Sequence, residues 1–168
     1  MAKYFNTSGE LTQQLLAAGN NFNLSKISLT NTQKVSKCKV DLYIEKKLTG
    51  KFYVLKGVEM PIGVTLEHSF SMNNFEGEFG LYLKLTDGAT FTLTGSIDPI
   101  ASTTVTGVGT AFLSEVSIGD EIVVTGETRT VSNITSDTSL TVSSAFSDNS
   151  NDATPDCNPT ALVDVIIN

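Results

Sequence analysis

Few side chains of this sequence have the chemistry of a nucleophile or a metal ligand. There is one histidine, His68, and there are two cysteines, Cys38 and Cys157. A catalytic triad needs a base that an acid orients and that faces a nucleophile. His68 lies between Glu67 and Ser69 on a predicted strand, and no local motif pairs it with Cys38. We therefore interpret His68 as an ordinary strand or interface residue.

The two cysteines are too few for a disulfide framework. A single disulfide between Cys38 and Cys157 is possible if the last strand of the chain pairs near residues 38–44, because the two sulfur atoms would then be close. The alternative is a pair of reduced, half-buried thiols, because a cytoplasm keeps thiols reduced. We favour the reduced thiols.

Three further polar segments contain residues of the kinds found in binding or catalytic sites. Oxygen ligands lie close together in residues 148–152 (Asp148, Asn149, Asn151 and Asp152), but their spacing is not that of an EF-hand loop. The glycines of residues 107–110 are not followed by the lysine of a phosphate-binding loop. Asp120 and Glu121 are adjacent, so on a strand they point to opposite faces. The sequence thus predicts no catalytic, cofactor-binding or metal-binding residue, and the chain is not expected to be an enzyme.

Composition narrows the class of protein. The chain of 168 residues has 40% hydrophobic and 17% charged residues and a net charge of −7. Phosphate binding needs clustered lysine and arginine, so the charge argues against a nucleic-acid partner. No apolar run approaches the ~20 residues that span a bilayer. The polar start of the chain shows no signal peptide, which predicts synthesis in a cytoplasm.

Alternating apolar and polar residues predict antiparallel strands. Residues 38–45 alternate with period two and residues 51–56 return, which predicts a β-hairpin over residues 37–56. Residues 65–70 and 80–85 predict further strands, whereas residues 11–19 fit either one or two helical turns or an extended lead-in. Strands at this spacing without a long helix predict an all-β fold, an antiparallel, jelly-roll-like β-sandwich.

The chain ends in an apolar run, residues 162–167, that must pair with an earlier strand. We expect it beside the strand that ends at Leu85, with Val163, Val165 and Ile167 on one face. The preceding residues, 89–158, have nine acidic residues and one basic residue, a net charge of −8, whereas the rest has ten basic and nine acidic, a net charge of +1.

This charge difference suggests two domains. We predict a β-sandwich formed by residues 1–88 and 159–168. Residues 89–158, of which 25 of 70 are Ser or Thr, would then be a small β-barrel-like domain inserted before the last strand. Within it, Gly126 suits a hairpin position that needs a positive φ.

Two sets of segments carry a resemblance to a known family. Residues 26–32, 40–44, 52–58 and 60–66 resemble a β-sandwich module of tailed-bacteriophage virion proteins. Residues 103–112 (TTVTGVGTAF), 116–122 (VSIGDEI) and 138–142 (TSLTV) resemble a small β-module that recurs in phage structural and fibre proteins. The resemblance implies a structural part of a virion and brings no catalytic residue with it.

Six lysines surround the predicted hairpin and form the candidate docking surface: Lys34, Lys37, Lys39, Lys46, Lys47 and Lys51. A basic patch of this kind fits an acidic capsid or tail surface. The alternative is a solvated hairpin whose lysines protect a sheet edge from pairing with other chains.

These observations lead to a functional hypothesis. We expect a non-enzymatic structural component of a bacteriophage virion, foremost a capsid decoration or cement protein that binds the outside of the shell through its β-sandwich. Its partners would be major capsid or tail and neck subunits, and the chain itself as a homo-oligomer, a trimer being one form. It would be located in the virion, assembled in the host cytoplasm, without a cofactor. The alternatives are a tail, neck or fibre accessory protein and a carbohydrate-binding adhesion module.

Overall fold

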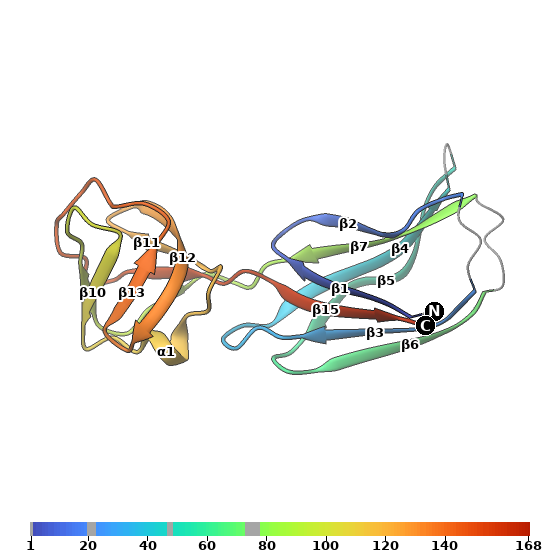
Figure 1. Ribbon diagram of the computed structural model, residues 1–168, viewed down its shortest axis with the longest axis horizontal. Coiled ribbons are helices and arrows are strands. Elements are labelled where there is room, and N and C mark those ends of the chain that lie inside the picture. The colour runs from blue at the N-terminus through green and yellow to red at the C-terminus, as the bar shows by residue number, and fades with distance from the viewer. Residues whose placement is uncertain (1, 20–22, 47–48, 73–77) are drawn as a thin grey trace. The chain divides into compact units, whose positions relative to one another are not determined.

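A computed structural model describes residues 2–19, 23–46, 49–72 and 78–168, and the remaining residues lie outside the description. The described chain is built almost wholly of antiparallel strands, with one short helix (Figure 1). It divides into two compact units. The first unit contains Met1–Gln33, Lys37–Asp87 and Ala161–Asn168, and the second contains Lys34–Ser36 and Gly88–Thr160.

The first unit consists of two four-stranded antiparallel sheets. The order in one sheet is β1-β15-β3-β6 and in the other β2-β7-β4-β5. With the second unit set aside, β15 is the eighth strand, so the two sheets read 1-8-3-6 and 2-7-4-5. This is the strand order of a jelly roll, which agrees with the predicted fold class. The strands are β1 (Lys3–Ser8), β2 (Thr12–Leu16), β3 (Leu24–Asn31), β4 (Cys38–Lys46), β5 (Gly50–Met60), β6 (Thr65–Met72), β7 (Phe79–Thr86) and β15 (Leu162–Ile167).

The apolar side chains that alternate along the strands point inward and form the core between these two sheets. Val40, Leu42 and Leu83 are fully buried and belong to the same hydrophobic cluster as Val163 and Val165 from the facing sheet. Successive side chains of a strand point to opposite faces, so the intervening residues of each strand face outward. Burial of each large apolar side chain contributes about 1.5–3 kcal/mol, which makes this shared core the main source of stability of the sandwich.

The position of the last strand differs from the one expected. β15 pairs with β1 and with β3, where Val165 lies opposite Leu29, and not with the strand that ends at Leu85. That strand, β7, lies in the other sheet between β2 and β4. The prediction was wrong because consecutive strands of a jelly roll mostly alternate between the two sheets. The faces were predicted correctly, since Val163, Val165 and Ile167 are buried.

Residues 11–19, for which the sequence fits either helical turns or an extended lead-in, contain a strand and no helix. β2 covers Thr12–Leu16 and pairs with β7. The predicted hairpin is present, because β4 and β5 pair antiparallel from Cys38 opposite Met60 to Lys46 opposite Gly50.

The second unit contains a seven-stranded sheet in the order β8-β14-β11-β12-β13-β10-β9. Its β8 and β9 lie at opposite ends of the order, so the described strands do not close into a barrel. An isolated bridge between Ile97 and Asp152 joins β9 to the segment before β14, and the sheet is therefore strongly curled. Its elements are β8 (Phe91–Thr92), β9 (Ser96–Asp98), β10 (Thr104–Val108), α1 (Phe112–Glu115), β11 (Glu121–Val124), β12 (Glu127–Ser136), β13 (Ser139–Val142) and β14 (Asp156–Asn158).

A two-residue turn connects β11 to β12. Val124 pairs with Glu127, and the turn residues Thr125 and Gly126 have φ values of 51° and 80°. Two positive φ angles define a type I′ turn, whose twist matches that of the hairpin. The positive φ expected for Gly126 is confirmed, and Thr125 shares it although it carries a β-branched side chain.

Hydrogen bonds hold the two ends of the second unit together. The amide of Gly88 donates to the carbonyl of Pro159 over 3.2 Å. The carboxylate of Asp120, which is fully buried, accepts from the amide of Thr160 over 2.9 Å and from the amide of Ser117 over 2.8 Å. The neighbouring Glu121, the first residue of β11, is exposed. Asp120 is thus a structural anchor for the segment that leaves the unit.

Candidate docking surface

Three tyrosines form a row across the outer face of the β2-β7-β4-β5 sheet. Tyr43 of β4 lies opposite Tyr53 of β5 and Tyr82 of β7. The ring centroids of Tyr43 and Tyr82 are 5.4 Å apart with an interplanar angle of 12°, and those of Tyr43 and Tyr53 are 5.5 Å apart at 51°. The amide of Gln14 on β2 donates to the Tyr82 hydroxyl over 2.8 Å. We call Tyr43, Tyr53 and Tyr82 the tyrosine row.

Lysines lie over two rings of the tyrosine row. The ammonium nitrogen of Lys51 is 4.5 Å from the ring centroid of Tyr43, and that of Lys56 is 4.9 Å from the centroid of Tyr53. Both distances are in the range of cation–π attraction. A hydrogen bond to Tyr43 is the main cause that raises the pKa of Lys51. Tyr43 is only 2% exposed, whereas Tyr53 is 45% exposed, so the row ends in an accessible aromatic ring.

The six predicted lysines have different surroundings. Lys39 and Lys51 are exposed on strands β4 and β5. Lys37 forms an ion pair with Glu59 over 2.9 Å, which lowers the pKa of that carboxyl, and Lys46 pairs with Glu78 and lies over the ring of Phe79. Lys34 belongs to the second unit, and Lys47 lies outside the described residues.

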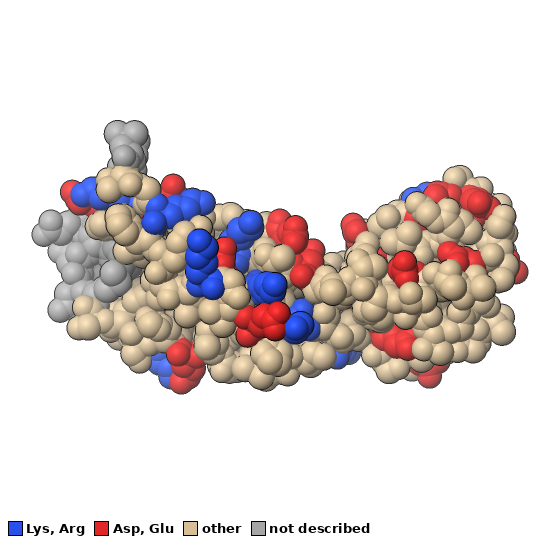
Figure 2. Space-filling view, turned by 180° about the vertical axis from the view of Figure 1, so that it is seen from behind, with Lys and Arg blue, Asp and Glu red and all other residues tan. Residues whose placement is uncertain are grey.

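The charges of the two units differ. Figure 2 shows lysine side chains gathered on the first unit with acidic side chains among them, whereas the second unit displays mainly acidic side chains. With the boundaries of the units, the first has nine basic and nine acidic residues and the second has two basic and nine acidic residues, which gives net charges of 0 and −7. The candidate surface is therefore mixed in charge and distinguished by its ordered Tyr–Lys contacts.

Sequence reasoning missed the tyrosine row and Lys56. A signal was present for Tyr43, because the period-two pattern of residues 38–45 places it on the polar face with Lys39 and Glu45. The alignment with Tyr53 and Tyr82 depends on the pairing of β4 with both neighbours, which includes register shifts against β5. Such shifts are not readable from a single sequence.

The other candidate residues occupy structural positions. Cys38 and His68 lie in different sheets, and His68 makes an edge contact with Phe70 at 4.7 Å between centroids. Cys38 and Cys157 are free and buried, and burial raises their pKa values to about 11 and about 12. The condition for their bridge is not met, since the last strand pairs with β1 and β3 and not with residues 38–44.

The carboxylates of the polar loop of residues 148–152 accept hydrogen bonds from backbone amides. Asp148 accepts from the amide of Ser150 over 2.8 Å, and Asp152 accepts from the amides of Thr125 and Thr154 over 2.7 and 2.9 Å. Within the described residues, no group of three or more His, Cys, Asp or Glu side chains is placed to hold a metal ion. None of the described helices is long and apolar enough to cross a membrane.

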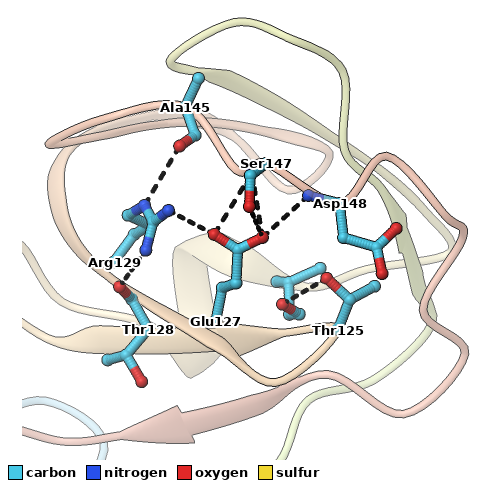
Figure 3. Close-up of polar contacts among 8 residues, drawn as sticks. Thr125, Glu127, Thr128, Arg129, Ala145, Ser147 and Asp148 are labelled. Atoms are coloured by element: carbon cyan, nitrogen blue, oxygen red, sulfur yellow. Dashed lines mark hydrogen bonds and ion pairs between the residues drawn. The ribbon is translucent and has the colours of Figure 1, made fainter.

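A polar cluster around Glu127 holds a loop of the second unit (Figure 3). Its carboxylate accepts from the Ser147 hydroxyl over 2.6 Å, from the Asp148 amide over 2.8 Å and from the Arg129 guanidinium. Arg129 also donates to the carbonyl of Ala145 over 3.2 Å. The bond from Ser147, followed by those from Asp148 and Arg129, lowers the pKa of Glu127 to about 2. The cluster fastens a loop to the β11–β12 hairpin.

Comparison with known proteins adds little to this picture. No protein-family model and no curated protein matches the chain. A solved structure, the crystal structure of PBSX exported protein XepA, is similar over 99% of this chain and 86% of that chain, with 11% sequence identity and a TM-score of 0.27. A likeness at that TM-score supports no inference about function.

Proposed function

We propose that the chain is a non-enzymatic structural protein of a tailed-bacteriophage virion that docks on other virion subunits through the outer face of its β2-β7-β4-β5 sheet. The foremost form of this proposal is a capsid decoration or cement protein outside the shell. The phage assignment is supported by the sequence resemblance of both modules. Jelly rolls occur in viral capsid proteins as well as in lectin domains and cupins, so the fold is compatible with the proposal without deciding it.

The tyrosine row is the main observation in support of a docking surface on this sheet. Tyrosine is enriched at protein interfaces, where a large, rigid ring buries apolar area and its hydroxyl keeps a polar contact. Here the ring of Tyr43 contacts those of Tyr53 and Tyr82, and Lys51 and Lys56 lie over the row. Side chains that are already held in place in the free protein lose less conformational entropy on association. The lysines fit an acidic surface on the partner.

Particles that lack the protein provide the test. Purified chain is added back, and binding is measured by co-sedimentation. We expect Tyr53→Ala to weaken binding about 30-fold, the loss of an interface anchor worth ~2 kcal/mol. Lys56→Glu should weaken binding most at low salt, and its defect should shrink as salt is raised, because salt screens the repulsion between the new carboxylate and an acidic partner. Tyr4→Ala is the matched control, because Tyr4 is 71% exposed on the other sheet. Equal binding by the Tyr53→Ala and wild-type chains would refute the docking surface.

Copy number per particle separates the two virion locations. Hundreds of copies by quantitative gel densitometry support a decoration protein of the shell, whereas tens or fewer support a tail, neck or fibre accessory protein. A chain that is absent from purified particles would contradict both.

The exposed ring of Tyr53 also favours a second candidate, a carbohydrate-binding adhesion module. Sugars stack on exposed aromatic rings, and Tyr53 is such a ring at an edge strand. The ammonium group of Lys56 over this ring competes with a stacked sugar, so we rank docking on protein first. A glycan array on which the wild-type chain binds and Tyr53→Ala does not would reverse that order.

A further inference from the structure

Strand β6 is an edge of the first unit whose only charged side chain among residues 65–72 is Glu67, which is in an ion pair with Lys26. β1 and β5, two other edges, carry lysine, and β2 has five residues with a register shift. β6 has eight residues, Thr65–Met72, without lysine, proline or glycine. Edge strands without such residues readily accept another strand.

The inward side of β6 is incompletely covered. Leu66 and Phe70 pack against the hydrophobic core but stay half-buried, whereas Ile27 and Leu29 on the adjacent β3 are fully buried. Another strand beside β6 would extend the sheet over the apolar surface that Leu66 and Phe70 leave exposed. The gain follows from the usual free energy of apolar burial.

We propose that β6 pairs antiparallel with β6 of a second copy of this chain around a twofold axis through His68. In this register His68 lies opposite His68 of the second copy, and Leu66 lies opposite Phe70. Glu67 lies opposite Ser69 on the outer face. A twofold interface must be complementary to itself, and this register pairs apolar with apolar and anion with hydroxyl.

The charges select this register. Lys26 lies opposite Ser69 within one chain, so the proposed pairing creates a row of Lys26, Ser69 and then Glu67 of the second copy. Neighbouring strands are about 4.8 Å apart, and the short serine leaves room for the long side chains to approach each other above it. Glu67 already bonds to Lys26 of its own chain over 2.5 Å and to Ser28 over 3.1 Å, so it is held on this face.

Neighbouring registers are less favourable. A shift that centres the axis on Glu67 places two carboxylates directly opposite each other, which is destabilising. A shift toward the other end centres the pairing on Ser69 and extends it further past residues 70–71. There the register between β3 and β6 is interrupted, with one extra residue on β6. The register through His68 avoids the first problem and reaches less far into the interrupted segment, ending with Thr65 opposite Ser71.

This inference deepens the proposed function by naming a self-partner, and it uses a surface on the other sheet from the tyrosine row. Its failure and the failure of particle docking are therefore distinguishable. Dimerisation is measured with purified chain alone, while docking is measured with particles and depends on Tyr53.

Cross-linking tests the register. A mixture of Glu67→Cys chains and Ser69→Cys chains should form a disulfide dimer under mild oxidation at least ten-fold faster than either variant alone. The native Cys38 and Cys157 do not compete, because they are buried and their pKa values are raised. Equal rates for the mixture and the single variants would overturn the register.

Sedimentation equilibrium tests the dimer itself. Ser69→Glu should lower the association constant at least ten-fold, because it places a carboxylate opposite Glu67 twice. The double variant Glu67→Lys with Ser69→Glu should restore association, and Ser8→Glu on β1 is the matched control. A wild-type chain that stays monomeric at ~1 mM, the concentration that corresponds to only about −4 kcal/mol of association, would overturn the proposal.

Discussion

Replacement of Asp120 by alanine should destabilise the second unit strongly. The Asp120 side chain is fully buried and accepts from the amides of Ser117 and Thr160 over 2.8 and 2.9 Å, with the thiol of Cys157 3.9 Å away. A buried donor that loses its acceptor costs ~1–3 kcal/mol, so two amides give about 2–6 kcal/mol. Because a domain of 60–100 residues shifts by ~4–8 °C for each kcal/mol, we expect Tm to fall by at least ~8 °C.

Differential scanning calorimetry of the full chain measures this loss. Glu121→Ala is the matched control, because Glu121 follows Asp120 directly but is exposed, and surface substitutions change stability by about 0.5 kcal/mol or less. The first unit should keep its own transition in both variants. A loss below ~1 kcal/mol in Asp120→Ala, or an equal loss in Glu121→Ala, would refute the anchoring role of this carboxylate.

Three further predictions concern single side chains. The pKa of Glu127 is lowered from 4.5 to about 2, so its contribution to stability is present above pH ~4.5 and is lost as the pH falls toward 2; the difference in Tm between wild type and Glu127→Gln should shrink over that range. Thr125→Asn should raise the stability of the second unit by about 1 kcal/mol in denaturant melts, because asparagine tolerates the positive φ better than threonine; a lower midpoint would contradict this. Cys38 and Cys157 should label with a thiol reagent at pH 8 only as fast as the chain unfolds, since a pKa of about 11 or 12 leaves ~0.1% thiolate or less; rapid native labelling would contradict their burial.

The alternation of apolar and polar residues correctly predicted the strands that have one buried and one solvent-exposed face. Val40, Leu42 and Val163 are buried where the period of two placed them, because one face of each strand meets the opposite sheet. Neighbours in the sheet were harder to predict. The expectation for β15 failed because strand order depends on which sheet each strand enters, and hydrophobic pattern alone does not specify that.

The candidate surface was predicted less completely than the fold. Lysines are conspicuous in a sequence, but their partners are not, such as Glu59 for Lys37 and Glu78 for Lys46. The contact of Tyr43 with Tyr53 and Tyr82 arises from three strands that are distant in sequence. The anchoring role of Asp120 was likewise hidden, because its partner Thr160 is 40 residues away.

The central position of β15 also has a consequence for synthesis of the chain. β15 separates β1 from β3, so the first sheet is incomplete until Leu162–Ile167 have left the ribosome. Most of the second unit, Gly88–Thr160, is translated before β15. The later-encoded domain therefore matures first and the earlier one last, the reverse of the usual N-terminal-first order. Any nascent or truncated chain that lacks Leu162–Ile167 exposes two unpaired strand edges, which makes translational arrest before Leu162 a specific source of aggregation.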